Sequence, residues 1–314
     1  MSWAYVFPGQ GSQIVGMGKD LSEAFVEAKE VFQEIDDSLN QSLSKVMFEG
    51  PEHDLVLTEN AQPALMAVSL AVIRIIERQG SISIKNTARY VAGHSLGEYS
   101  ALAAAGSISL ADTARLLKKR GCAMQAAVPV GKGAMAALIG LDLDAVREVI
   151  SEGSIDEEVC AAANDNAPGQ IVISGHKAAV ERAAELAKKR GAKRAVMLAV
   201  SAPFHCSLMA PAAEEMEVAL SVVNVKPPVV PLIANVTANS VIDPDQIKQS
   251  LVDQIVSMVR WRESVQLMAE VGVDTLIEIG SGRVLTGLSK RISRNLNTVN
   301  LQNPEDIENF LKLH

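Results

Sequence analysis

The chain has 314 residues and a formal net charge of −8, and 48% of its residues are hydrophobic but only 4% aromatic. This length and apolar content predict one or two domains with a sizeable core and exclude a disordered chain, while the acidic balance argues against a general nucleic-acid binder. The three cysteines form no C-x-x-C pair, so we expect neither a disulfide framework nor a zinc site, and a reducing cytoplasm as the setting. They are Cys122, Cys160 and Cys206.

The first predicted element is an apolar strand over Trp3–Phe7, which ends in the glycine-rich loop 8–13. This start lacks a basic region and is broken by Pro8, so we interpret it as a strand and not as a signal peptide. No uncharged apolar run reaches about 18 residues, so no membrane span is expected. Two interpretations of the loop are equal by spacing: glycines that let N–H donors approach an oxyanion, or a phosphate-binding loop. The missing G-K-[ST] weakens the second.

Helices are predicted over 20–37 and 61–79, and the next strand, over 88–92, leads into Gly93-His94-Ser95-Leu96-Gly97. This G-x-S-x-G signature stands before an Ala-rich helix over 98–105. A strand that turns directly into a helix forces tight dihedral angles at its middle residue, so both flanking residues must lack bulk. The pattern favours Ser95 as a nucleophile, with the Leu96 N–H as an oxyanion donor. The alternative is an ordinary glycine-flanked turn.

A serine nucleophile needs a base, for which histidine is the first candidate at neutral pH. His205 follows the last strand of the middle region, where a loop is able to reach the elbow; the alternative is a structural histidine. His94 is adjacent to Ser95 and is expected to pack beside the site. No Asp or Glu stands out as the group that orients the imidazole, although a carbonyl would serve equally. The other histidines are His53, His176 and His314.

A helix over 110–126 contains Lys118, Lys119 and Arg120. One interpretation is that these cations simply favour a helix C-terminus. The other is that one of their side chains turns inward and binds an anionic substrate. Arginine suits the second role because its planar fork grips a carboxylate at two points.

The middle of the chain has the order β-α-β-β-α-β, with strands over 133–139, 159–163, 170–174 and 194–199 and helices over 142–152 and 176–190. This is the ferredoxin-like unit. We therefore predict that residues 128–200 form a small subdomain inserted in a larger α/β subdomain made of 1–127 and 201–314. Helices near 207–222 and 244–258 alternate with strands over 231–236, 273–279 and 297–301, which predicts a mostly parallel sheet covered on both faces.

Segments along nearly the whole chain resemble the malonyl-CoA:acyl carrier protein transacylases of bacterial type II fatty-acid synthesis. The segments are 7–13, 93–99, 119–121, 163–164, 200–206, 259–261 and 278–288. The resemblance implies an α/β-hydrolase-like core, with Ser95 as the acylated nucleophile and His205 as its base. It also implies that Arg120 clamps the malonyl carboxylate, that the Gln10 and Leu96 N–H groups form the oxyanion hole, that the main-chain carbonyl of Gln254 orients His205, and that His94 and Asn164 line the pocket.

The reaction implied by this resemblance is transfer of malonyl from malonyl-CoA to the phosphopantetheine thiol of acyl carrier protein, without a metal or cofactor. We expect a cytoplasmic monomer. An acidic carrier needs a basic patch, either residues 188–190 with Lys193 and Arg194, or 290–291 with Arg294. One rival function is a thioesterase or other hydrolase of the G-x-S-x-G class, which usually has Ser-Asp-His order. The second is a carrier-binding module with a vestigial site.

Overall fold

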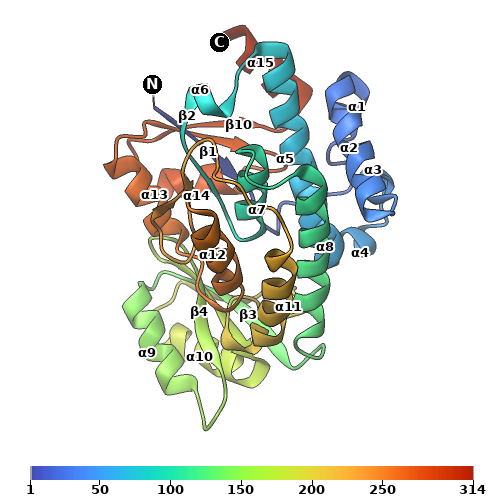
Figure 1. The fold of residues 1–314 in the computed structure, drawn as a ribbon. Coiled ribbons are helices and arrows are strands. Elements are labelled where there is room, and N and C mark those ends of the chain that lie inside the picture. Colours follow the sequence, from blue (N-terminus) through green and yellow to red (C-terminus); the bar gives the residue numbers. More distant parts are fainter. Residues whose placement is uncertain (1, 314) are drawn as a thin grey trace.

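Two β-sheets organise the chain in the computed structural model, which describes residues 2–313 (Figure 1). The larger sheet has the strand order β10-β9-β1-β2-β7-β8, and every neighbouring pair is parallel except β7 with β8. The predicted α/β fold with a mostly parallel sheet is therefore confirmed. Its strands are β1 (Trp3–Phe7), β2 (Ala88–Gly93), β7 (Leu232–Ile233), β8 (Ser240–Val241), β9 (Thr275–Ile279) and β10 (Asn297–Leu301).

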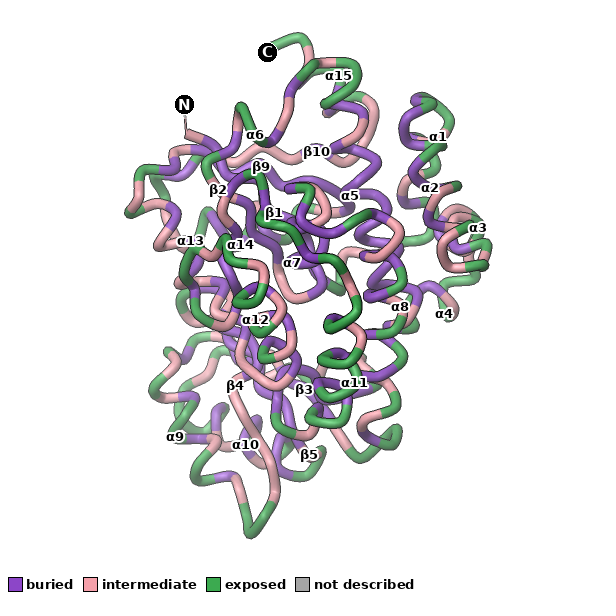
Figure 2. Tube along the Cα trace, in the orientation of Figure 1, coloured by how far each residue is buried: buried purple, intermediate pink, exposed green. Residues whose placement is uncertain are grey.

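Helices cover both faces of this sheet because its strands alternate two apolar sets of side chains. Tyr5 and Phe7 of β1 point into the core shared with α2, α5 and α7, whereas Ala4 and Val6 pack with α13 and α14. All residues of β1 and β9 are buried, as a doubly covered strand requires (Figure 2). The helices of this part are α1 (Lys19–Ala24), α2 (Val26–Leu39), α3 (Leu43–Glu49), α4 (Glu52–Leu55), α5 (Thr58–Gly80), α6 (Ile84–Thr87), α7 (Leu96–Ala104), α8 (Leu110–Ala126), the 3₁₀ helix η1 (Ser207–Met209), α11 (Ala210–Ser221), α12 (Pro244–Val256), α13 (Trp261–Glu270), α14 (Val284–Ile292) and α15 (Pro304–Leu313).

The structure differs from the sequence predictions at several elements of this part, for example the strand over 231–236, which is only two residues long as β7. The single helix over 20–37 is divided at Phe25, whose backbone is extended with φ −130° while its side chain is buried. The chain bends there so that α2 can pack along α5. Helix α13 was not predicted, although its buried Trp261, Val265 and Met268 have helical spacing.

The smaller sheet is antiparallel, with the order β4-β5-β3-β6, and α9 (Leu143–Gly153) and α10 (Lys177–Lys189) pack against it. It lies at the opposite end of the molecule from the two termini (Figure 1). The predicted β-α-β-β-α-β unit is confirmed. Its strands, β3 (Gly133–Ile139), β4 (Cys160–Ala167), β5 (Gln170–His176) and β6 (Arg194–Met197), all fall within 128–200, which we propose as the inserted subdomain.

Main-chain hydrogen bonds join the small sheet to the segment after α12, beside the site described below. The N–H of Asp165 in β4 donates to the carbonyl of Val259 (2.9 Å), and the N–H of Val259 donates to the carbonyl of Ala163 (2.9 Å). This short parallel bridge fixes the small sheet against the segment that follows α12. Of the helices in the described part of the chain, none has the length and hydrophobicity needed to cross a membrane.

Candidate active site

The turn between β2 and α7 holds Ser95 in a conformation that few residues adopt, with φ 53° and ψ −111°. Both flanking glycines are sterically required. A Cβ atom at Gly93 would lie 1.9 Å from the carbonyl carbon of Gly97, and one at Gly97 would lie 2.2 Å from the carbonyl oxygen of Phe7. The backbone strain at Ser95 is therefore imposed by its neighbours, and it projects the hydroxyl beyond the carboxyl end of the sheet.

Asn235, just after β7, fastens this elbow to the next strand. Its Oδ1 accepts the Ser95 N–H (2.8 Å), and its Nδ2 donates to the carbonyl of Gly93 (2.7 Å). Asn235 is fully buried, so these bonds are shielded from water. The sequence analysis missed this residue. The available signal was a polar residue directly after an apolar strand, at the sheet edge where ligands of α/β proteins bind.

Ser95 and His205 form a hydrogen-bonded pair across 110 positions of sequence, with 2.8 Å between Ser95 Oγ and His205 Nε2. The Nδ1 of His205 lies 2.7 Å from the main-chain carbonyl oxygen of Gln254. A carbonyl only accepts, so Nδ1 carries the hydrogen and Nε2 faces the serine as an acceptor. Burial, followed by the nearby positive charge of Arg120, lowers the pKa of His205 to about 3. The imidazole is therefore neutral at pH 7 and able to accept a proton.

Arg120 lies inside α8, not at its end, and its side chain is directed into the protein, where the residue is 1% exposed. Helix α8 approaches α5 very closely at the next residue, since a Cβ at Gly121 would lie 2.4 Å from the Cα of Glu59. The Arg120 Nη1 donates to Gln62 Oε1 (2.7 Å), and Nη2 donates to Gln254 Oε1 (2.7 Å) and Ser95 Oγ (3.1 Å).

The buried guanidinium of Arg120 has only neutral hydrogen-bond acceptors. Within residues 2–313 no carboxylate lies within ion-pair distance of it, and its Nε has no partner. Removing a charge from water without a counterion is costly. The arrangement is therefore suited to an anionic ligand that brings its own carboxylate next to Ser95.

Glu98, in the first turn of α7, is also fully buried. Its Oε2 accepts from the main-chain N–H of Asn235 (3.0 Å) and from Gln254 Nε2 (2.8 Å). Burial raises the pKa of Glu98 to about 7, against the opposing effects of these hydrogen bonds and of Arg120. Sequence reasoning assigned it no role, although a carboxylate in an otherwise apolar helix start is an unusual feature.

A cavity of about 400 Å³ opens above these groups. Gln10, from the loop after β1, and Leu96, the first residue of α7, both line it with Ser95. The first N–H groups of a helix have no partner within the helix, so the Leu96 N–H is a suitable oxyanion donor. Residues 198–199, predicted as the end of a strand, instead follow β6 and form part of the wall together with Val200.

His94 and Asn164 also line this cavity. The His94 Nε2 lies 2.8 Å from Asn166 Oδ1, and its ring packs 5.9 Å from that of Trp261. Burial is the main cause that lowers the pKa of His94. The structure thus brings together all eight candidate residues: Gln10, His94, Ser95, Leu96, Arg120, Asn164, His205 and Gln254.

The remaining histidines lie elsewhere. His53 is exposed in α4, and His176 accepts a hydrogen bond from the Val159 N–H at Nδ1 (2.8 Å). His314 lies outside the described residues. Among residues 2–313, no three His, Cys, Asp or Glu side chains group closely enough to hold a metal ion.

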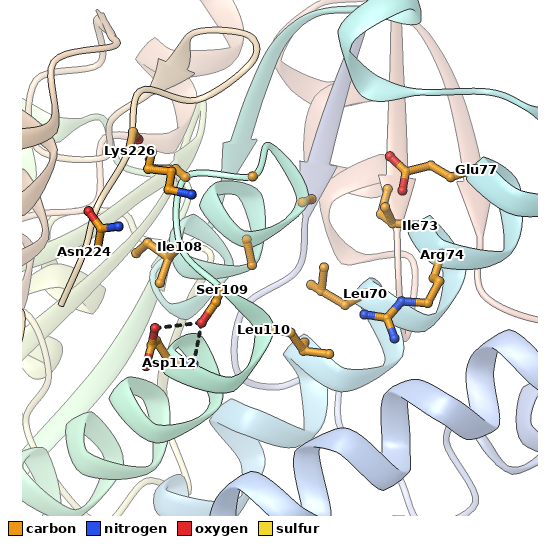
Figure 3. A pocket seen from close by; sticks show the side chains of 14 residues that line it. Leu70, Ile73, Arg74, Glu77, Ile108, Ser109, Leu110, Asp112, Asn224 and Lys226 are labelled. Carbon is orange, nitrogen blue, oxygen red and sulfur yellow. Dashed lines mark hydrogen bonds between the residues drawn. The ribbon is translucent and has the colours of Figure 1, made fainter.

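A second cavity, of about 360 Å³, lies between α5, the start of α8 and the segment around Lys226 (Figure 3). Its serines serve the local fold. Ser109 accepts the Asp112 N–H at the start of α8 (3.1 Å), and Ser107 donates to the carbonyl of Lys226 (2.6 Å). Arg74 faces Glu34 of α2. No residue that lines this cavity is a histidine or cysteine.

Comparison with known proteins agrees with this geometry. Residues 4–301 match the family described as "Acyl transferase domain". The malonyl CoA-acyl carrier protein transacylase of Bacillus subtilis is 47% identical over 305 residues, which cover 97% of this chain and 95% of that protein. The crystal structure of acyl-carrier-protein-S-malonyltransferase from Bartonella henselae has 56% identity and a TM-score of 0.97, covering 100% of this chain and 99% of that one. A malonyl-transacylase in complex with a type II PKS acyl-carrier protein has 42% identity and a TM-score of 0.96, covering 100% of both chains.

Proposed function

The chain belongs to the acyl transferase domain family, and we propose that it acts there as a malonyl-CoA:acyl carrier protein transacylase. It is a transferase that moves the malonyl group from malonyl-CoA to the carrier protein of fatty-acid synthesis. One observation supports this function most strongly. The buried guanidinium of Arg120, which has no carboxylate partner among the described residues, lies 3.1 Å from the Ser95 oxygen, and the same oxygen contacts the neutral His205. The site therefore unites a nucleophile, a base and a binding site for an acyl carboxylate.

The first half-reaction transfers the acyl group to Ser95. As the Ser95 oxygen attacks the thioester carbonyl, His205 Nε2 takes the hydroxyl proton. The N–H groups of Leu96 and Gln10 stabilise the oxyanion of the tetrahedral intermediate. When the carbon–sulfur bond breaks, the imidazolium returns its proton to the CoA thiolate, and malonyl remains as an ester of Ser95.

The second half-reaction repeats these steps with a different nucleophile. The phosphopantetheine thiol of the carrier gives its proton to His205 and attacks the ester, and the Ser95 oxygen leaves with that proton. The thioester supplies its own activation, so we propose that no metal or cofactor takes part.

Arg120 selects the acyl group in this proposal. The malonyl carboxylate reaches the guanidinium and supplies the counterion that it lacks within the protein. An acetyl group offers no such partner.

The carrier protein docks beside α14 in this proposal. Of the two basic patches, the first is partly compensated, because Arg190 pairs with Glu148 and Glu152 and Lys188 pairs with Glu185. The second, formed by Lys290, Arg291 and Arg294, has no carboxylate partner among the described residues, and Arg291 contacts the turn between β4 and β5. Helix α14 begins next to loop 8–13, which lines the cavity. Just before the helix, Ser281 Oγ donates to the carbonyl of Ser12 in this loop (2.8 Å).

The test is intact-mass measurement of the protein mixed with malonyl-CoA, with Ser95→Ala as the control. We expect a gain of one malonyl group that persists in water and disappears when carrier bearing a phosphopantetheine thiol is added. Loss of the group in water as fast as its transfer to the carrier would indicate a hydrolase. No gain of mass would indicate a binding module and refute the proposal.

A further inference from the structure

A single buried carboxylate, Glu98, contacts both segments that support the catalytic groups. Its Oε2 accepts from the Asn235 N–H (3.0 Å), and Asn235 in turn holds the Ser95 N–H. The same Oε2 accepts from Gln254 Nε2 (2.8 Å), while its Oε1 has no partner among residues 2–313. Glu98 makes no direct hydrogen bond to Arg120 or His205, so its hydrogen-bonded connection to Arg120 runs through Gln254, while the charges of Glu98 and Arg120 also act on each other through space.

Only one orientation of the Gln254 side-chain amide forms hydrogen bonds with both Glu98 and Arg120. Its Nε2 donates to Glu98 and to the carbonyl of Ser95 (3.0 Å), and its Oε1 accepts from Arg120 Nη2 (2.7 Å). If the amide were reversed, its NH₂ group would face the guanidinium and its oxygen would face a carboxylate. In a buried site, a donor would then face a donor and an acceptor would face an acceptor. Since a carboxylate and a main-chain carbonyl only accept, Glu98 and the carbonyl of Ser95 together determine which end of the amide faces Arg120.

We infer that Glu98 is a positioning residue for acyl-group selection: by orienting the side-chain amide of Gln254, it holds the Arg120 guanidinium where the carboxylate of the acyl group binds. This inference rests on the proposed function. Gln254 then has two separate tasks, because its main-chain carbonyl orients His205 while its side chain places Arg120. The burial that raises the pKa of Glu98 also excludes water that would otherwise satisfy a rotated amide.

Two conservative variants separate position from charge. Glu98→Gln keeps a carbonyl acceptor at the Oε2 position but removes the charge, whereas Glu98→Asp keeps the charge but withdraws the carboxylate by one methylene. The readout is the ratio of kcat/KM for Ser95 acylation by malonyl-CoA to that by acetyl-CoA. We expect Glu98→Gln to retain the wild-type ratio within a few-fold and Glu98→Asp to lower it roughly 10-fold, the order expected for one misplaced charge-assisted hydrogen bond. The opposite order would overturn the inference.

A double variant tests whether Glu98 acts through Gln254. Gln254→Leu removes the side-chain amide and leaves the main-chain carbonyl, so it should lower the ratio by itself. Adding Glu98→Asp should then produce no further loss. Additive losses would contradict the inference.

Glu278 offers a matched control for the loss of a buried carboxylate. It is 1% exposed and accepts the N–H groups of Leu285 (3.0 Å) and Thr286 (2.7 Å) at the start of α14, away from Arg120. Glu278→Asp should lower the melting temperature without changing the ratio. If wild-type protein is not acylated or does not prefer malonyl, the proposed function fails. If it prefers malonyl and Glu98→Asp retains that preference, only the role of Glu98 fails.

Discussion

Replacing Arg120 with Ala should reduce the preference for malonyl over acetyl without abolishing acylation of Ser95. The guanidinium is 1% exposed and lies 3.1 Å from the Ser95 oxygen, so an acyl carboxylate on that oxygen meets it away from bulk water. A charge-assisted hydrogen bond of this kind contributes about 1.5–3 kcal/mol, and each 1.4 kcal/mol is about tenfold. We therefore expect the preference to fall about 10- to 150-fold.

Acetyl transfer should survive this substitution because the base remains available. The charge of Arg120 lowers the pKa of His205, so its removal raises that pKa, but burial is the larger cause and still keeps the imidazole neutral at pH 7. The loss should therefore be confined to the acyl group that carries a carboxylate.

The assay is single-turnover acylation followed by intact mass, with malonyl-CoA and acetyl-CoA in parallel. Arg115→Ala is the matched control, because Arg115 lies on the same helix but is exposed and paired with Asp112. An unchanged malonyl-to-acetyl ratio in Arg120→Ala, or an equal loss with both substrates, would refute the clamp.

Further substitutions test the elbow, the base and the docking patch. Gly93→Ala should destabilise the protein by about 3 kcal/mol or more, because its Cβ would overlap the Gly97 backbone, whereas Gly287→Ala, with open space in α14, should stabilise it by up to about 1 kcal/mol; thermal melts compare the two. His205→Ala should slow acylation roughly 100- to 10,000-fold. Because a pKa of about 3 leaves His205 unprotonated above that pH, the acylation rate should show no histidine inflection near pH 6.5. A halving there that persists in Glu98→Gln, which lacks the carboxyl group whose pKa is about 7, would contradict this description of the base. Reversing the charges of Lys290 and Arg294 should slow transfer to the carrier and weaken the salt dependence of that transfer, while acylation by malonyl-CoA stays unchanged. Lys85→Glu on α6 is the control, and an equal effect of this variant on transfer would exclude a specific docking patch.

The selectivity of the site depends on keeping a cation buried without a carboxylate partner. Gln62 and Gln254 hold the guanidinium with neutral oxygens, so an arriving carboxylate does not have to displace an ion pair. An internal salt bridge to Arg120 would lower the energy of the empty enzyme and compete with the substrate. The carboxyl group of Glu98 is nearby, but the Gln254 amide lies between it and Arg120.

The sequence alone determined the features that depend on neighbouring residues. Gly93 and Gly97 indicate the strained turn at Ser95 because a Cβ atom at either glycine would collide with backbone, either a few residues away or on the adjacent strand. The alternation of apolar strands with helices predicted the mostly parallel sheet, and the order of elements over 128–200 predicted the antiparallel one, because both orders follow from local hydrophobic patterns. The resemblance to transacylases then indicated which distant residues to join.

Only the tertiary structure decided how those distant groups meet. Ser95, Arg120, His205 and Gln254 come from four separate segments, and their distances of 2.7–3.1 Å depend on the packing of α8, α12 and the loop after β6 against the end of the sheet. Asn235 after an apolar strand and Glu98 in an apolar helix start are unusual in the sequence, but their roles could not be predicted, since an amide or carboxylate acquires its role only from the partner that faces it. Local sequence patterns therefore do not predict hydrogen bonds between distant segments, because the energy of these bonds depends on distances that only the folded core establishes.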